Sequence, residues 1–146
     1  MCTNNGASIE DGLEMVEAGE DICEGIDRSV LAGLRELQVK GDPDIIAEVG
    51  GLFIKHSPSK ISAILQAAES GDSKGLQMAA HSLKSSSAYI GAMRLSALSK
   101  ELEQMGRSNS MNGAKDKAKM LEAEYMRVMI ALKVEIELAN ESSNKQ

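Results

Sequence analysis

Capping signals at short intervals divide most of this chain into segments of helical length. Three short motifs are typical of helix starts: Asp42-Pro43, Ser57-Pro58 and Asp72. Glycines that can end a helix follow the apolar segments between them. These glycines are Gly41, Gly71, Gly91 and Gly106. The connections left by this pattern are short, and short connections make consecutive helices antiparallel neighbours.

Within these segments the apolar residues recur with helical periodicity, at 26, 30, 31, 34 and 37 in the first of them. We expect the next helix to start at Pro43 with Asp42 as its cap, a separate helix to start at Ser57-Pro58, and Asp72 to cap the helix that contains His81. The segment 92–105 should form a helix that ends at Gly106. The last helix should bury one face, made of Leu121, Tyr125, Val128, Leu132 and Ile136.

The composition agrees with a helical fold. Phe53, Tyr89 and Tyr125 are the only aromatic residues, and nine methionines join the leucines and alanines as core candidates. This mixture suits helices better than sheets, and no segment has a strand pattern. We therefore predict an all-α fold, an up-and-down antiparallel four-helix bundle with additional N-terminal helices.

The 146 residues fit one domain. We expect residues 27–139 to form the helical bundle and 140–146 to be a frayed tail. Residues 1–26 are acidic and contain glycines, so we interpret them as an N-terminal extension in which IEDGLEMVEAG has weak helical character.

Charge and cysteine content narrow the function classes. The net charge is −6 and no basic stripe is visible, which argues against a nucleic-acid binder. Cys2 and Cys23 lack metal-ligand or redox spacing, so a reducing cytoplasm is the expected compartment. The first residues have neither a basic nor an apolar region, as a signal peptide would, and no apolar run is long enough to cross a bilayer.

His81 is the residue that raises a functional question, because it stands before a lysine and three serines inside a helical segment. At about 100° per residue, it lies almost opposite the apolar stripe that includes Leu76 and Leu83. A solvated polar residue is the simplest interpretation of an outward histidine. A metal ligand is disfavoured, because His56 is the only other histidine and does not have metal-site spacing.

The neighbours of His81 favour a chemical role. Lys84 follows one turn later, and the small residues Ser85, Ser86, Ser87 and Ala88 should leave the surface around His81 open to a partner. Neutral imidazole is a good nucleophile near neutral pH, and a lysine could stabilise an anionic group on the ring. Taken alone, Lys84 could equally be a solvated lysine, and the serines could serve close helix packing.

At these residues the chain resembles the histidine-containing phosphotransfer (HPt) domains of phosphorelays. The family pattern is close to AHxLKGSSxxxGAxxLxxxCxxLE, and residues 80–103 read AHSLKSSSAYIGAMRLSALSKELE. The upstream segment LRELQVKGDPDIIAEVGGLFIKHSP also resembles the first helices of the family. The resemblance covers roughly residues 27–138.

The resemblance implies roles for four residues. His81 matches the phosphorylated histidine, and Lys84 matches the lysine that interacts with the phosphoryl group. Glu103 falls where the family often has a Gln or Glu that orients the ring through Nδ1, which would leave Nε2 as nucleophile. Glu103 could instead be a solvated helix carboxylate. Arg107 corresponds to an arginine in some members.

The chain departs from the family pattern at two positions. Ser85 replaces the usual glycine, and Ser99 replaces a common cysteine. Serine is small, so the resemblance still implies an accessible docking surface around His81, while Ser99 is expected to pack. That surface should consist of Gln77, Met78, Ser85 and Ala88.

The function that the resemblance implies is that of a phosphorelay intermediate. His81 would accept a phosphoryl group from the phospho-aspartate of a receiver domain and pass it to another receiver. The chain lacks an ATP-binding kinase motif, so we expect a stoichiometric carrier rather than an enzyme. It would need no cofactor of its own, because Mg²⁺ belongs to the receiver. The expected partners are response-regulator receiver domains and a hybrid histidine kinase, with neither nucleic acid nor membrane, and the chain should be a monomer.

Three other functions are weighed against this one. A non-phosphorylated binding module could dock on a receiver or kinase and inhibit it, although it would not need the pair His81 and Lys84. A structural helical adaptor is the second alternative. A metallohydrolase is the third, and two unclustered histidines argue against it.

Overall fold

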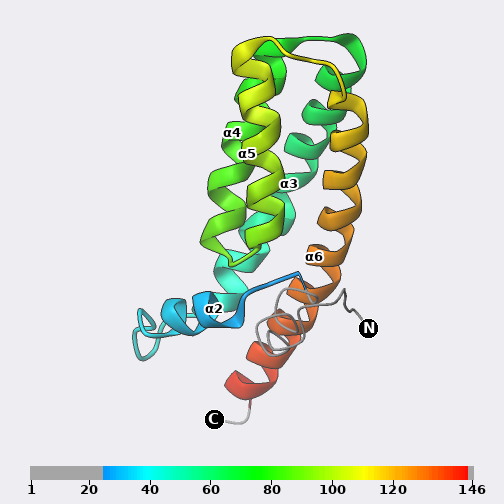
Figure 1. Ribbon diagram of the computed structural model, residues 1–146. Coiled ribbons are helices and arrows are strands. Elements are labelled where there is room, and N and C mark those ends of the chain that lie inside the picture. The colour runs from blue at the N-terminus through cyan, green and yellow to red at the C-terminus, as the bar shows by residue number, and fades with distance from the viewer. Residues whose placement is uncertain (1–24, 145–146) are drawn as a thin grey trace, which may run out of the picture.

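The computed structural model describes residues 25–144, and within them the chain forms five helices and no strand (Figure 1). The helices are listed here in chain order. They are α2 (Arg28–Arg35), α3 (Ile45–Ser70), α4 (Ser73–Tyr89), α5 (Met93–Ser108) and α6 (Ala114–Asn144). The predicted all-α fold is confirmed.

Helices α3 to α6 form an up-and-down antiparallel bundle. Each packs against its neighbours in the chain, and α6 also packs against α3, which closes the bundle. Helix α2 lies across one end of the bundle, where it contacts α3 (Figure 1). It is one of the additional N-terminal helices that we predicted, whereas residues 1–24 of the predicted N-terminal extension lie outside the described residues.

The core consists of the apolar faces that the periodicity predicts. On α6, Leu121, Tyr125, Val128 and Leu132 are buried and Ile136 packs against them. The scarcity of aromatic residues is visible here, because Phe53 and Tyr125 form one ring contact at 6.3 Å and aliphatic side chains fill the rest of the core. Burial of these faces holds the bundle together.

The predicted helix start at Ser57-Pro58 is wrong, because α3 runs through both residues without a break. Pro58 lacks an N–H group and costs a helix interior about 3 kcal/mol. Burial of Phe53 and Ile61 on either side of Pro58 compensates for this cost. The buried Ser57 does not cap a helix either, since its hydroxyl forms a 2.8 Å hydrogen bond with the Tyr125 hydroxyl.

The predicted boundaries around residues 37–45 also need correction. Helix α2 ends at Arg35, well before Gly41, so Leu37 stays exposed. Helix α3 is capped by Asp44 rather than Asp42. The cause is the Gln38 side chain, whose carbonyl accepts a 2.6 Å hydrogen bond from the Ile45 N–H and whose amide donates to the Pro43 carbonyl.

Two later helices extend further than we expected. Helix α5 passes Gly106 and ends at Ser108, where Asn109 adopts the left-handed conformation with φ of 57°. Helix α6 continues to Asn144, past the boundary at 139 that we predicted for the domain. None of the helices within residues 25–144 is long and apolar enough to cross a membrane.

The turn between α4 and α5 follows the prediction and ties the N-terminal segment to the bundle. Gly91 ends α4 with a positive φ of 85°. Its carbonyl accepts a 2.7 Å hydrogen bond from the Asp27 N–H. A Cβ atom at this position would lie only 2.7 Å from the Asp27 carbonyl oxygen, so both the backbone angle and the contact require glycine.

Candidate functional site

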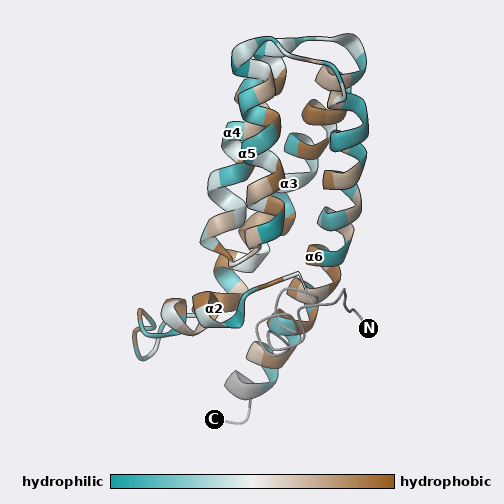
Figure 2. Cartoon of the chain, viewed as in Figure 1, coloured by the Kyte–Doolittle hydropathy of each residue, from teal (hydrophilic) through white to brown (hydrophobic). Residues whose placement is uncertain are grey.

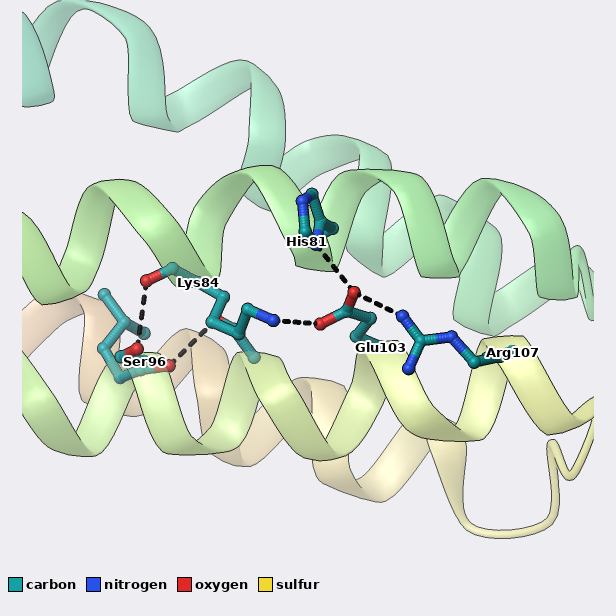
Figure 3. A network of polar contacts seen from close by, with 7 residues as sticks. His81, Lys84, Ser96, Glu103 and Arg107 are labelled. Carbon is teal, nitrogen blue, oxygen red and sulfur yellow. Dashed lines mark hydrogen bonds and ion pairs between the residues drawn. The ribbon is translucent and has the colours of Figure 1, made fainter.

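His81 lies on the outer face of α4, as its position on the helical wheel predicts. Its side chain is 62% exposed. The Nδ1 atom lies 2.7 Å from Oε2 of Glu103, which belongs to α5 (Figure 3). A carboxylate only accepts hydrogen bonds, so Nδ1 carries the proton of a neutral ring and Nε2 carries the lone pair. Nε2 makes no hydrogen bond within residues 25–144.

Glu103 is a buried carboxylate that binds three cationic or polar side chains. Its side chain is only 3% exposed, so the alternative of a solvated carboxylate is wrong. Oε1 accepts a hydrogen bond from Lys84 Nζ at 2.7 Å. Oε2 accepts from Arg107 Nη2 at 2.9 Å as well as from His81. Figure 3 shows these side chains converging on the carboxylate from α4 and α5.

These contacts keep Glu103 ionised despite its burial. The hydrogen bond from Lys84 is the strongest influence and lowers the pKa of the carboxyl group, and the contact with His81 lowers it further. Burial raises the pKa but does not offset them. The negative charge of the Glu103 carboxylate therefore lies next to the exposed imidazole. A proton on Nδ1 would point at this carboxylate.

Lys84 binds the same carboxylate as His81. It comes from the turn after His81, but its Nζ atom contacts Glu103 and its side chain is 30% exposed. Lys84 and His81 therefore share one carboxylate. Arg107, which the sequence assigned on weaker grounds, contacts the same carboxylate from the next turn of α5.

Ser96 belongs to the same network and was not identified from the sequence. Its hydroxyl donates a 2.9 Å hydrogen bond to the backbone carbonyl of Lys84, across the interface between α5 and α4 (Figure 3). The spacing of Ser96, Glu103 and Arg107 is seven and then four residues, which places them on one face of a helix. That spacing was available as a signal for the side of α5 that faces α4.

Gly106 allows the end of α5 to approach α4 closely. A Cβ atom there would lie 2.5 Å from the Ser73 carbonyl oxygen and 2.7 Å from the Gln77 backbone nitrogen. Glu103 and Arg107 lie on either side of Gly106 in the sequence. The close contact at Gly106 therefore fixes where these two residues lie along α4 relative to His81. The glycine that we interpreted as a helix end is a packing position instead.

The predicted docking residues all lie on α4 around the histidine. Met78 and Ser85 are exposed, and Gln77 and Ala88 are half-buried. Ser87, which we expected on the same surface, is buried instead. Ser99, where the family pattern often has cysteine, is buried and its hydroxyl bonds the Leu95 carbonyl at 2.8 Å, which agrees with a packing role.

Comparisons with known proteins agree with this arrangement. The Hpt domain family model matches residues 48–137, a range that contains the whole network of His81, Lys84, Ser96, Glu103 and Arg107. The crystal structure of histidine-containing phosphotransfer protein B (HptB) from Pseudomonas aeruginosa PAO1 is similar, with a TM-score of 0.69 and 29% sequence identity. The match covers 77% of this chain and 95% of that one. No curated protein sequence matches the chain.

The family match spans well over half of the 146 residues, and the fold and the surroundings of His81 agree with it. The chain therefore belongs to the Hpt domain family, which gives it a role related to phosphotransfer in two-component signalling.

Proposed function

We propose that this protein is a phosphorelay intermediate that carries a phosphoryl group on Nε2 of His81. The supporting observation is the pairing of an exposed imidazole with a buried carboxylate that holds its Nδ1 atom at 2.7 Å. This contact sets the tautomer and the direction of the ring before a partner arrives. The group would come from the phospho-aspartate of one receiver domain and pass to the aspartate of another.

The proposed reaction balances without a further reactant. The Nε2 lone pair attacks phosphorus in line, the bond between phosphorus and the aspartate oxygen breaks, and the aspartate leaves as a carboxylate. The ring then carries both the phosphoryl group and the Nδ1 proton, so the imidazole becomes cationic. Glu103 compensates this new positive charge, because its carboxylate is already in hydrogen-bonding contact with Nδ1. Reversal of the step passes the group on.

Lys84 would contribute by neutralising charge on the phosphoryl oxygens. Phosphoryl transfer has a loose transition state, so catalysis comes mainly from positioning and charge. Nζ contacts Glu103 and the Lys84 side chain is 30% exposed, so in this proposal a change of rotamer would bring Nζ to the phosphoryl group. Arg107 would stay on Oε2 and keep the carboxylate paired after Lys84 has moved.

The partners in this proposal are response-regulator receiver domains and a hybrid histidine kinase. The receiver supplies Mg²⁺ and the aspartate, while this chain supplies the aimed ring and the surface of Gln77, Met78, Ser85 and Ala88. It acts as a stoichiometric carrier, since each domain holds one phosphoryl group and returns to its starting state only after passing it on.

The test is incubation of the chain with a panel of radiolabelled phospho-receivers. We expect label on the parent and on His56→Gln, which changes the other histidine, an exposed residue of α3. His81→Gln should stay unlabelled, and the label on the parent should be lost in acid and retained in base. Label that persists in His81→Gln contradicts the proposal. A chain that binds a phospho-receiver and stays unlabelled would be the inhibitory binding module.

A further inference from the structure

The surface around His81 is cationic, although the chain as a whole has a net charge of −6. Helix α4 contains two lysines, Lys74 and Lys84, and no carboxylate. Arg107 adds a third cation from α5, and its side chain is 59% exposed. Glu103 is the buried carboxylate of this region and offsets one of the three charges. The surface that a partner meets at His81 therefore keeps a net positive charge.

Lys74 differs from the other two cations because its charge is not used inside the domain. Its side chain is exposed and makes no ion pair with any residue in the range 25–144. Asp72, the nearest carboxylate in the sequence, accepts a hydrogen bond from the Gly75 N–H and caps the helix, so its charge serves the N-terminus of α4. Figure 2 shows hydrophilic residues recurring along α4. The ammonium group of Lys74 is therefore available to a partner.

Lys74 is placed to contact a partner of His81 but not a phosphoryl group on the ring. It precedes His81 by seven residues, nearly two helical turns, so the two side chains leave the same face of α4 about 10 Å apart. An interface of standard size buries about 800 Å² on each partner, a disc with a radius of about 16 Å. A protein seated on His81 therefore covers Lys74. This lysine should affect association and not the chemical step.

The partner surface that approaches His81 is anionic by its chemistry. In the proposed function a receiver presents phospho-aspartate and Mg²⁺, and proteins hold Mg²⁺ with one or two carboxylates besides the phosphoryl oxygens. The charges of the phosphoryl group and the metal ion cancel, so the carboxylates leave this surface negative. Opposite charges across an interface speed association and fix the orientation of the partners. The acidic remainder of this chain repels the same surface, which favours approach to α4.

We infer that Lys74 is a docking residue that pairs with a carboxylate of the receiver about 10 Å from the phospho-aspartate. The inference rests on the proposed function, since it takes a receiver domain as the partner. It also assigns selectivity, because a receiver with a neutral or basic side chain at that distance loses the ion pair and binds more weakly. The cations around His81 then divide their work. Lys84 and Arg107 serve the reaction, and Lys74 serves recognition.

Charge reversal at Lys74 tests this role with the receiver of the panel that binds the parent most tightly. An exposed ion pair contributes up to about fivefold to a binding constant, and reversal adds repulsion, so Lys74→Glu should raise the dissociation constant about tenfold at low salt. The difference should shrink to about twofold or less in about 0.5 M salt, which screens exposed charges. Transfer at saturating receiver should keep the parent's rate. The variant should melt like the parent, because glutamate is favourable in the first turn of a helix.

The matched control is Lys119→Glu, which changes the net charge equally at an exposed position of α6. It should bind the receiver like the parent. Equal dissociation constants for Lys74→Glu and Lys119→Glu overturn the inference, as does a parent that binds no receiver. A slower transfer rate for Lys74→Glu at saturating receiver also overturns it, since the lysine would then act in the reaction. A failure of the proposed function looks different: the receiver binds, Lys74→Glu weakens binding, and His81 stays unlabelled.

Discussion

His81 Nδ1 and Glu103 Oε2 lie 2.7 Å apart across the interface between α4 and α5, with the ring exposed and the carboxylate buried. The histidine can therefore meet a partner while the group that aims it stays shielded from water. In the proposed reaction this carboxylate has a second task, because it faces the positive charge that forms on the ring. A substitution of Glu103 can separate its effect on the orientation of the ring from the effect of its charge.

Glu103→Gln should keep the fold and slow transfer from a phospho-receiver to His81 by about five- to tenfold. The amide oxygen can still accept the hydrogen bond from Nδ1, but the charge that compensates the cationic ring is lost. Charge-assisted hydrogen bonds are stronger than neutral ones by about 1 kcal/mol, which corresponds to this factor. Single-turnover transfer kinetics measure the effect.

The control for this variant is Glu101→Gln, which removes an exposed carboxylate from the same helix. Its transfer rate should equal that of the parent. Equal rates for Glu103→Gln and the parent would show that the carboxylate only orients the ring.

Lys84→Ala should slow transfer or shorten the lifetime of the phosphohistidine by about tenfold. A cation beside a phosphoryl group at a partly exposed site is worth roughly 1 kcal/mol or somewhat more. Stability should also fall somewhat, since the buried Glu103 loses its strongest partner and keeps only Arg107 and His81. Lys100→Ala, an exposed lysine on α5, is the matched control. Unchanged rate and lifetime in Lys84→Ala would leave the lysine with a structural role only.

The two buried glutamates should respond to pH with opposite signs. The pKa of Glu103 is lowered, chiefly by Lys84, so its ionised form stabilises the fold above the unfolded pKa, and this contribution is lost as the pH falls through the folded pKa. The pKa of Glu124 is raised by burial, against smaller opposing effects of Arg127 and Arg94. Its Oε2 atom has no hydrogen-bond partner. Ionised Glu124 therefore costs stability at neutral pH.

Thermal melting of two amide variants measures these signs. At pH 7, Glu124→Gln should melt above the parent and Glu103→Gln below it. The Glu124 difference should shrink as the pH falls toward about 4, near the ordinary pKa of glutamate, because the carboxyl with the raised pKa is protonated first. The Glu103 difference should persist to lower pH, because the lowered pKa keeps that carboxyl ionised in the folded protein. A Glu124→Gln variant that melts below the parent at pH 7 would show that Arg94 and Arg127 outweigh burial.

The sequence predicts those parts of this molecule that depend on local signals. Asp72 caps α4 through the Gly75 N–H, Gly71 ends α3 in the left-handed conformation, and the outward direction of His81 follows from periodicity alone. Each of these features depends on a few neighbouring residues. The continuous α3 does not, because a contact with Tyr125, 68 residues away, holds Ser57 inside the helix.

The contacts around Glu103 also cannot be predicted from neighbouring residues in the sequence. The three contacts of Glu103 depend on how far α5 is shifted along its axis relative to α4. The close approach at Gly106 sets that shift. The family resemblance points to Glu103 as a residue that contacts the ring. It does not show that Lys84 rests on the same carboxylate, or that Ser96 holds the backbone of α4 in place.

The last prediction concerns Ser85, where the chain departs from the family pattern. The side chain is exposed one turn after His81, about 5–6 Å away at Cβ, so any group there stands beside the ring that a receiver must reach. Ser85→Gly should lower stability by roughly 0.5 kcal/mol, the difference in helix propensity, and leave transfer intact or faster. Ser85→Arg should fold like the parent, since the position faces away from the core.

Transfer to Ser85→Arg should nevertheless be slow, because the long side chain obstructs the approach of a receiver to Nε2. Melting temperature and receiver-to-His81 transfer, measured on the parent and both variants, separate the two effects. If Ser85→Arg melts far below the parent, the position is more tightly packed than its exposure indicates. If it folds and accepts phosphate at the parent's rate, the receiver approaches from the side of Met78 and Gln77, and the docking surface is narrower than the four residues we assign to it.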